Sequence, residues 1–206
     1  MALKTRVIVS EVNNLHDGRY CAGMGVDMIG FPLDAGHPHH ISAEVFKEIA
    51  GWLAGVQFVG QLNESSIIDL AAYEAIDYLQ TNNVTLLPAL KKYEKPLILS
   101  VDVATLSVEE VKTLLAEHSA TVAFFLLTAE SEEITAEQKQ QLADLAKDYK
   151  VFIGFGLNAD NVNEVLDAVH PEGIGLQGGV EIKTGLNDFD ALADVLEAID
   201  TDEFAS

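Results

Sequence analysis

Two pairs of glycines give the clearest chemical signal in the chain. GFGLN spans residues 154–158 and QGGVE spans residues 177–181, and each pair follows a short apolar run. Glycine lets the backbone approach a ligand closely, and clustered amide N–H groups at a helix start attract anions. We therefore expect a phosphate or other anion site here, although both segments could also be ordinary tight turns. The expected binding residues are Gly154, Gly156, Leu157, Gln177, Gly178 and Gly179.

A second group of residues has the chemistry to move protons. Asp102 follows the apolar run LILSV, and the segment PLDAGHPHHIS contains His37, His39 and His40. Histidine titrates near neutral pH, and a carboxylate at the end of a buried strand is a candidate acid or base. We expect Asp102 to act with His37 or His39; the alternatives are a turn aspartate and loop histidines in solvent. No second ligand cluster accompanies the histidines, so neither a metal nor a cofactor is predicted.

Eight short runs of β-branched and apolar residues alternate with helical segments. A strand that is apolar on both faces is typical of a buried parallel sheet. The expected strands span residues 5–10, 26–31, 56–62, 75–80, 96–103, 121–127, 150–155 and 173–177. The expected helices span residues 14–24, 42–54, 65–73, 83–93, 107–118, 135–148, 158–168 and 188–200.

Helix start signals support several of these segments. Ser107 with Glu110, and Thr135 with Gln138, have the spacing of a capping box. The expected N-cap residues elsewhere are Ser42, Asn158 and Asn187. The third and fourth helices are the weakest, and Pro88 lies inside the fourth, where it lacks an N–H to donate.

Eight successive strand-and-helix units predict an α/β fold, namely a single (β/α)₈ barrel that spans residues 1–206 as one domain. An open doubly wound sheet is the structural alternative. In such a barrel the working face lies at the C-terminal ends of the strands, so the residues there are the ones to question. Besides those already named, the polar residues at expected strand ends are Ser10, Glu11, Asn13, Asn14, Asp34, Asn63, Glu64, Gln80, Thr128, Glu130, Glu132 and Glu133.

The composition limits the classes of function. The formal net charge of −21 disfavours binding to nucleic acid and to anionic membranes. No apolar run is long enough to cross a membrane, and the N-terminal residues have no signal-peptide layout, so we expect a cytoplasmic protein. The chain has one cysteine, Cys21, so it cannot form an internal disulfide. Cys21 is expected to be a small residue of the hydrophobic core, on the first helix. Asp17 and Arg19 are expected in solvent, with a buried ion pair as the alternative.

Four segments together resemble one known family. VDMIGF (26–31) is similar to a GADAIGF-like strand, and HPHHIS (37–42) stands at the position of an SPRYVS motif. GFGLNADNV (154–162) resembles AGGLNPENV, and QGGVEIKTG (177–185) resembles SSGVE. By the order and spacing of these motifs, the chain resembles phosphoribosylanthranilate isomerase over nearly its whole length. The resemblance implies the barrel and a phosphorylated sugar-like ligand.

The resemblance also implies where catalytic groups would lie. The family's general base, a cysteine in a KICG motif, falls on Ser10, and its general acid, an aspartate, falls on Thr128. The arginine of SPRY falls on His39, and the glycine after the base falls on Glu11, which could activate Ser10 or repel an anionic substrate. The family's Amadori rearrangement needs one group to protonate the ring oxygen and another to remove a proton from C2′. Because unaided hydroxyl groups do neither, we expect the ordinary isomerase activity to be absent or strongly impaired.

Three hypotheses follow. The chain is an enzyme of altered specificity that uses Asp102 and the loop histidines, a non-catalytic binding or regulatory protein, or the family's isomerase acting through other groups. In each case the expected partner is a small phosphorylated or anionic ligand, without nucleic acid or membrane, and the chain is a monomer or a homodimer.

Overall fold

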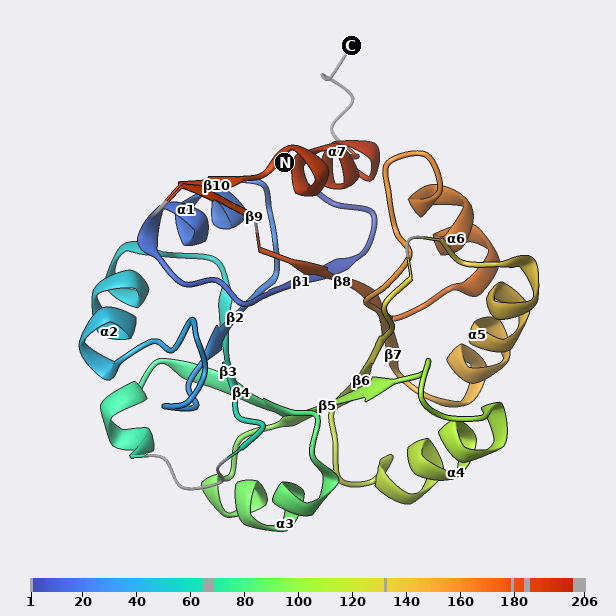
Figure 1. Cartoon of the computed structure of the whole chain (residues 1–206), viewed down its shortest axis with the longest axis horizontal. Helices are drawn as coiled ribbons and strands as arrows, with labels where there is room; N and C mark the ends of the chain where they lie inside the picture. The colour runs from blue at the N-terminus through green and yellow to red at the C-terminus, as the bar shows by residue number, and fades with distance from the viewer. Residues whose placement is uncertain (1, 65–68, 132, 179, 184–185, 202–206) are drawn as a thin grey trace.

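The strands form a closed barrel. The computed structural model describes residues 2–64, 69–131, 133–178, 180–183 and 186–201, with only the backbone described for 180–183 and 186–188. Eight parallel strands are hydrogen-bonded in the order β1 to β8, and β8 closes onto β1 (Figure 1). The predicted (β/α)₈ barrel is therefore confirmed. The strands are β1 (Arg6–Ser10), β2 (Met28–Pro32), β3 (Gln57–Gln61), β4 (Ile76–Thr81), β5 (Leu97–Asp102), β6 (Phe124–Thr128), β7 (Val151–Ile153) and β8 (Gly173–Gln177).

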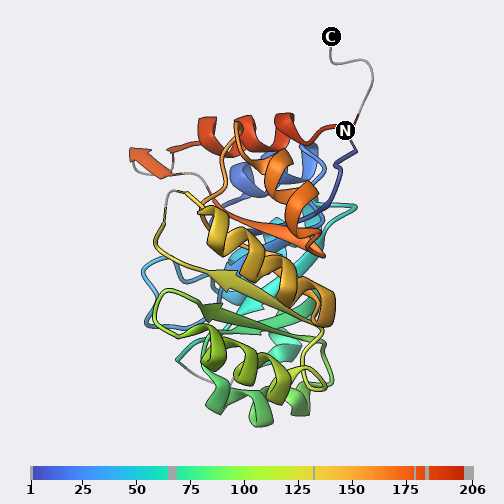
Figure 2. The same cartoon turned by 90° about the vertical axis from the view of Figure 1, so that its right-hand side faces the viewer.

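Helices cover the outside of the ring of strands. They are α1 (Leu15–Gly23), α2 (Ala43–Trp52), α3 (Leu87–Leu90), α4 (Val108–His118), α5 (Ala136–Asp148), α6 (Val162–Val169) and α7 (Asp190–Ala198). Figure 2 shows α4 to α7 following one another along one side of the barrel. Both expected capping boxes are present: Ser107 with Glu110 begins α4, and Thr135 with Gln138 begins α5. Ser42 caps α2 as expected, because its side chain accepts the N–H of Val45.

The two weak helices are much shorter than predicted. Of the expected helix at 65–73, the described part is a 3₁₀ turn, Leu70–Tyr73, while residues 65–68 lie outside the described residues. The expected helix at 83–93 is a 3₁₀ turn (Val84–Leu86), the single turn of α3 and a further 3₁₀ turn (Lys91–Tyr93). Pro88 explains the break, because it lies at the start of α3, where its missing N–H costs no helical hydrogen bond.

The last two helices begin later than predicted. Asn158 is not the N-cap of α6; its side chain accepts the N–H groups of Asp160 and Asn161, which forms a turn before the helix. Asn187 is not an N-cap either, because it lies in β10 (Leu186–Asp188), which pairs with β9 (Val180–Lys183). This hairpin was not predicted, and α7 begins only after it.

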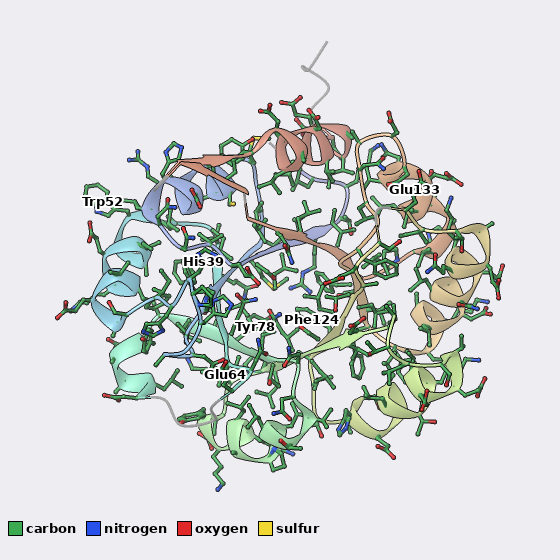
Figure 3. The ribbon with its side chains drawn as sticks, in the orientation of Figure 1. His39, Trp52, Glu64, Tyr78, Phe124 and Glu133 are labelled. Atoms are coloured by element: carbon green, nitrogen blue, oxygen red, sulfur yellow. The ribbon has the colours of Figure 1, made fainter. Side chains whose placement is uncertain are left out.

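The barrel interior is filled by every second residue of the strands. Side chains alternate between the two faces of a strand, so one set points inward and the other packs under the helices. Figure 3 shows Tyr78 and Phe124 inside the ring, while Trp52 points away from the barrel at the end of α2. On β8 the first two inward positions are the glycines Gly173 and Gly175, and a Cβ on Gly173 would lie 2.3 Å from the Phe152 ring. The buried inner cluster is Ile8, Met28, Val59, Ile98, Phe124, Leu126 and Phe152.

The end of the chain returns to its beginning. The N–H of Lys4 donates to the carbonyl of Ile199 at 2.9 Å, and the N–H of Thr201 donates to Ala2 at 2.8 Å. Nearby in α1, Cys21 is fully buried as predicted, but the expectation that Asp17 lies in solvent is wrong. Asp17 is 1% exposed, whereas Arg19 is exposed as expected.

Candidate functional site

A cavity opens where the strands end. It has a volume of about 740 Å³ and is lined by polar residues that continue the inward-pointing set. Ser10 lies two residues beyond Ile8 on β1, and Thr128 lies two residues beyond Leu126 on β6. The same step of two leads to the other polar lining residues of the strands, which are Gln61, Gln80, Ser100, Asp102 and Gln177. The strand period therefore brings residues from six strands to one mouth.

Glu11 has an unusual backbone at the rim of this cavity. Its φ angle is 60°, in the left-handed region that non-glycine residues rarely adopt. The side-chain oxygen of Gln61 accepts the N–H of Glu11 at 3.2 Å, which holds the residue in this conformation. Gly30 makes room for Gln61, because a Cβ there would lie 3.0 Å from the Gln61 amide carbon. Glu11 is exposed and lines the cavity, so it brings a carboxylate to the rim.

Asp102 and Thr128 lie side by side on the adjacent strands β5 and β6, where they are register partners. Asp102 is exposed, and its Oδ1 accepts the N–H of Ala104 at 2.9 Å, as in an Asx turn. Thr128 donates its hydroxyl to the carbonyl of Val101 at 3.4 Å. Asp102 thus shapes a turn, which is one of the two alternatives weighed from the sequence, and it also lines the cavity.

The amide side chain of Gln80 lies deeper in the cavity. Its Nε2 donates to the Ser100 hydroxyl at 2.8 Å, and the residue is 7% exposed. Its Oε1 is buried and has no hydrogen-bond partner among the described residues. A buried acceptor without a partner is costly, so this atom is suited to a donor that a ligand brings.

The glycine-rich loops are partly committed to the barrel itself. The N–H of Gly154 donates to Leu127 at 2.8 Å, and the N–H of Gly178 donates to Ser10 at 2.9 Å. Gly156 has a φ of 63°, and no acceptor for its N–H or that of Leu157 is found among the described residues. Gly179 lies outside the described residues. Of the backbone N–H groups expected to bind an anion, those of Gly156 and Leu157 are therefore the ones available for it among the described residues.

The loop histidines lie apart from the cavity lining. Figure 3 places His39 near β2, and its Nδ1 lies 3.2 Å from the side-chain nitrogen of Asn13. His37 accepts the N–H of His39 at 3.1 Å through its own Nδ1. Neither these two nor His40 is among the lining residues. The structure therefore brings Ser10, Asp102, Thr128 and Gln177 to one cavity and leaves the histidines beside it.

Across the described part of the chain, no three His, Cys, Asp or Glu side chains are grouped so that they could hold a metal ion. No helix in the same part is long and apolar enough to cross a membrane. Sequence reasoning missed Gln61 and Ser100 as lining residues, although the signal was available. Counting in steps of two from the apolar residues of β3 and β5 leads directly to both.

Sequence comparisons with known proteins point to one family. The sequence model described as N-(5'-phosphoribosyl)anthranilate (PRA) isomerase matches residues 90–198. The N-(5'-phosphoribosyl)anthranilate isomerase of Aquifex aeolicus is 27% identical over 193 residues, which covers 89% of this chain and 93% of the relative.

Solved structures show the same fold. The crystal structure of phosphoribosyl anthranilate isomerase from Thermotoga maritima has a TM-score of 0.76 at 21% identity, covering 95% of this chain and 98% of that chain. A second phosphoribosyl anthranilate isomerase structure has a TM-score of 0.72 at 21% identity, with the same coverage. It is a complex with reduced 1-(o-carboxyphenylamino)-1-deoxyribulose 5-phosphate.

Proposed function

Because the chain belongs to the N-(5'-phosphoribosyl)anthranilate isomerase family, we propose that it binds a small phosphorylated, sugar-like ligand without catalysing the family's usual rearrangement. One observation carries the proposal. Ser10 and Thr128, at the positions that resemblance gives to the base and the acid, both line the mouth cavity and both end in hydroxyl groups.

The loss of activity follows from the chemistry of these two groups. A general acid and a general base each contribute about 10²–10⁴ to the rate of a proton-transfer reaction. A serine becomes a useful base or nucleophile only beside an activating group. No histidine is among the described lining residues, and the Ser10 hydroxyl makes no hydrogen bond with Glu11 or Asp102 in the described structure. Thr128 already donates its hydroxyl to Val101.

The phosphate end of the ligand is proposed to bind at the loop between β7 and α6. The amides of Gly156 and Leu157 lie at the point where this loop turns, and the positive φ of Gly156 supports a backbone that presents successive N–H groups. Gln177, at the end of β8, lines the cavity on the same side. Backbone N–H groups suit this acidic chain, because they can bind an anion without the help of a lysine or arginine side chain.

Two measurements test the proposal together. The gene is introduced into a bacterial tryptophan auxotroph that lacks the isomerase, and the purified protein is assayed beside the Aquifex aeolicus relative. We expect no growth and turnover at least about 10³-fold below the relative. Growth together with turnover near that of the relative would overturn the non-catalytic part of the proposal.

Binding is measured separately by calorimetric titration with inorganic phosphate and with ribose 5-phosphate. We expect both to bind, ribose 5-phosphate more tightly. A Gly156→Ala variant that still folds should bind phosphate more weakly, because the left-handed backbone at this position disfavours alanine. If neither compound binds, the phosphate site is wrong, whatever the turnover assay shows.

The alternative of an altered enzyme is favoured by one observation: Glu11 and Asp102 line the same cavity. A carboxylate can remove a proton next to a carbonyl group, so this pair replaces the earlier combination of Asp102 with His37 or His39. In such an enzyme, Asp102→Asn abolishes turnover of the true substrate. In a binding protein the same variant retains binding, because an amide oxygen still accepts hydrogen bonds.

A further inference from the structure

The charges around the mouth cavity indicate what kind of chemical group it accepts. Glu11 and Asp102 are the charged residues of its described lining, and none of the described lining residues is a lysine, arginine or histidine. The chain also has a net charge of −21. An anionic group that entered the cavity would meet two carboxylates without a compensating cation, so the cavity repels it.

Neutral polar groups dominate the rest of the lining. Gln61, Gln80 and Gln177 come from three different strands, and asparagines 63, 82 and 83 lie on the loops above β3 and β4. The hydroxyl groups of Ser10, Ser100 and Thr128 complete the set. Amides and hydroxyls of this kind both donate and accept hydrogen bonds, which matches ligand hydroxyl groups that do the same.

Gln80 points to the same class of ligand independently of the charges. More than nine-tenths of this residue is buried, its Nε2 is engaged by Ser100, and its Oε1 has no partner in the described structure. With the amide in this orientation, the ligand must supply a hydrogen-bond donor. A hydroxyl group provides one, whereas an ionised carboxylate only accepts.

The two carboxylates complete the acceptor side of the cavity. Oδ1 of Asp102 is held by the N–H of Ala104, which leaves Oδ2 as an acceptor. Glu11 is fixed at the rim by Gln61, so its backbone is already in place before a ligand binds. Hydrogen bonds from neutral hydroxyl groups to carboxylates are among the stronger ones that a neutral ligand can make.

We propose that the mouth cavity holds an uncharged, hydroxyl-rich part of the ligand and rejects a carboxylate. The inference rests on the proposed function, since the phosphate of the same ligand binds outside the cavity at Gly156 and Leu157. The ligand class is therefore a phosphorylated polyol or sugar that bears no carboxylate.

A matched pair of compounds tests this inference by calorimetric titration. One is reduced 1-(o-carboxyphenylamino)-1-deoxyribulose 5-phosphate, and the other is the same molecule with hydrogen in place of the carboxylate. We expect the compound without the carboxylate to bind at least about tenfold more tightly. In the double variant Glu11→Gln with Asp102→Asn, the difference should shrink to about twofold or less, because the repelling charges are gone.

The matched control is Glu117→Gln, which removes a carboxylate from the exposed face of α4, outside the cavity. This variant should keep the full preference of the natural chain. Gln80→Leu, with its fold checked by circular dichroism, should weaken the binding of the compound without the carboxylate by about tenfold, because the buried acceptor is removed.

The outcomes separate the two proposals. If the carboxylated compound binds as tightly as its partner, or if the double variant keeps the full preference, the inference is overturned and the phosphate site stands. If neither compound nor inorganic phosphate binds to the natural chain, the proposed function fails and the inference fails with it.

Discussion

The side-chain oxygen of Gln61 accepts the backbone N–H of Glu11 at 3.2 Å. This contact joins the end of β3 to the residue that follows β1, and it holds Glu11 at a φ of 60°. The same contact places a carboxylate at the rim of the cavity. Glu11 therefore contributes both a negative charge to the cavity and strain to the backbone, and substitutions at this residue can measure the two effects separately.

Glu11→Gly should make the chain more stable. A left-handed backbone costs a non-glycine residue about 1–2 kcal/mol, and glycine loses about 0.5–1 kcal/mol through its freer unfolded chain. We expect a net gain of about 0.5–1 kcal/mol in the free energy of unfolding, measured in urea. Glu11→Ala is the control, because it removes the same carboxylate and keeps the strain. A glycine variant no more stable than the alanine variant would contradict this account.

Gly156→Ala should be clearly destabilising. The φ of 63° disfavours alanine, and an added Cβ would lie 2.9 Å from the carbonyl carbon of Glu133 in the preceding βα loop. Backbone strain and overpacking together predict a loss of about 2 kcal/mol or more in urea unfolding.

Gly23→Ala is the matched comparison for that variant. Gly23 lies at the end of α1, and a Cβ there meets nothing within 4 Å. Its substitution should be neutral or should stabilise the chain by up to about 1 kcal/mol, because alanine favours the helix. Equal losses at the two glycines would show that the contact with Glu133 does not exist in solution.

Cys21 should make the chain lose stability in alkaline solution. Burial, followed by the negative charge of Asp17, raises the pKa of its thiol from 9.0 to about 12. Between these values the unfolded chain releases the proton and the folded chain keeps it, so the stabilisation is complete below pH 9 and is lost as the pH rises. The slope from this group approaches about 1.4 kcal/mol per pH unit.

Urea unfolding at several pH values between 9 and 11 measures this slope. The pKa values of Tyr20 and Tyr73 are also raised by burial, so the natural chain alone does not isolate the cysteine. Cys21→Ala should give a shallower slope while the tyrosine contribution stays. Identical slopes in the two proteins would rule out the proposed linkage.

Thr128→Asp should weaken the binding of ribose 5-phosphate. The substitution places a third carboxylate in the cavity, beside Asp102 on the neighbouring strand. We expect affinity to fall by about tenfold at low salt and by less at high salt, because ions screen the repulsion. Thr128→Val keeps the shape without the charge and should change the affinity little. An unchanged affinity in the aspartate variant would mean that the ligand does not enter this cavity.

The strands were predicted well because burial on both faces leaves a plain mark in the sequence. The run at 173–177 matches β8 residue for residue, and the capping boxes of α4 and α5 lie where their spacing placed them. The prediction of one helix at 83–93 was wrong because Pro88 and the surrounding turns divide this segment, and the apolar periodicity of the sequence does not reveal such a break. The β9–β10 hairpin was missed because the glycine pair at 178–179, which precedes it, indicated only a turn between a strand and a helix.

Sequence order and the family resemblance were enough to identify Ser10, Asp102, Thr128 and Gln177 as strand-end residues, since each stands where an apolar run stops. The roles of these residues stay predictions. The chain alone also determined the acidic charge, the single cysteine and the barrel, because these depend on composition and on local alternation. The partners of each strand end are not local properties.

Only the tertiary structure decided which of these residues share a cavity. Closure of β8 onto β1 brings Gln177 to Ser10, while the loop after β2 leaves His37 and His39 outside the lining. The structure also showed that the N–H groups of Gly154 and Gly178 donate to carbonyls of neighbouring strands, and that the Gln61 side chain accepts the N–H of Glu11. The physical reason is that hydrogen bonds and burial at the mouth join residues far apart in the chain, and no local pattern specifies such pairs.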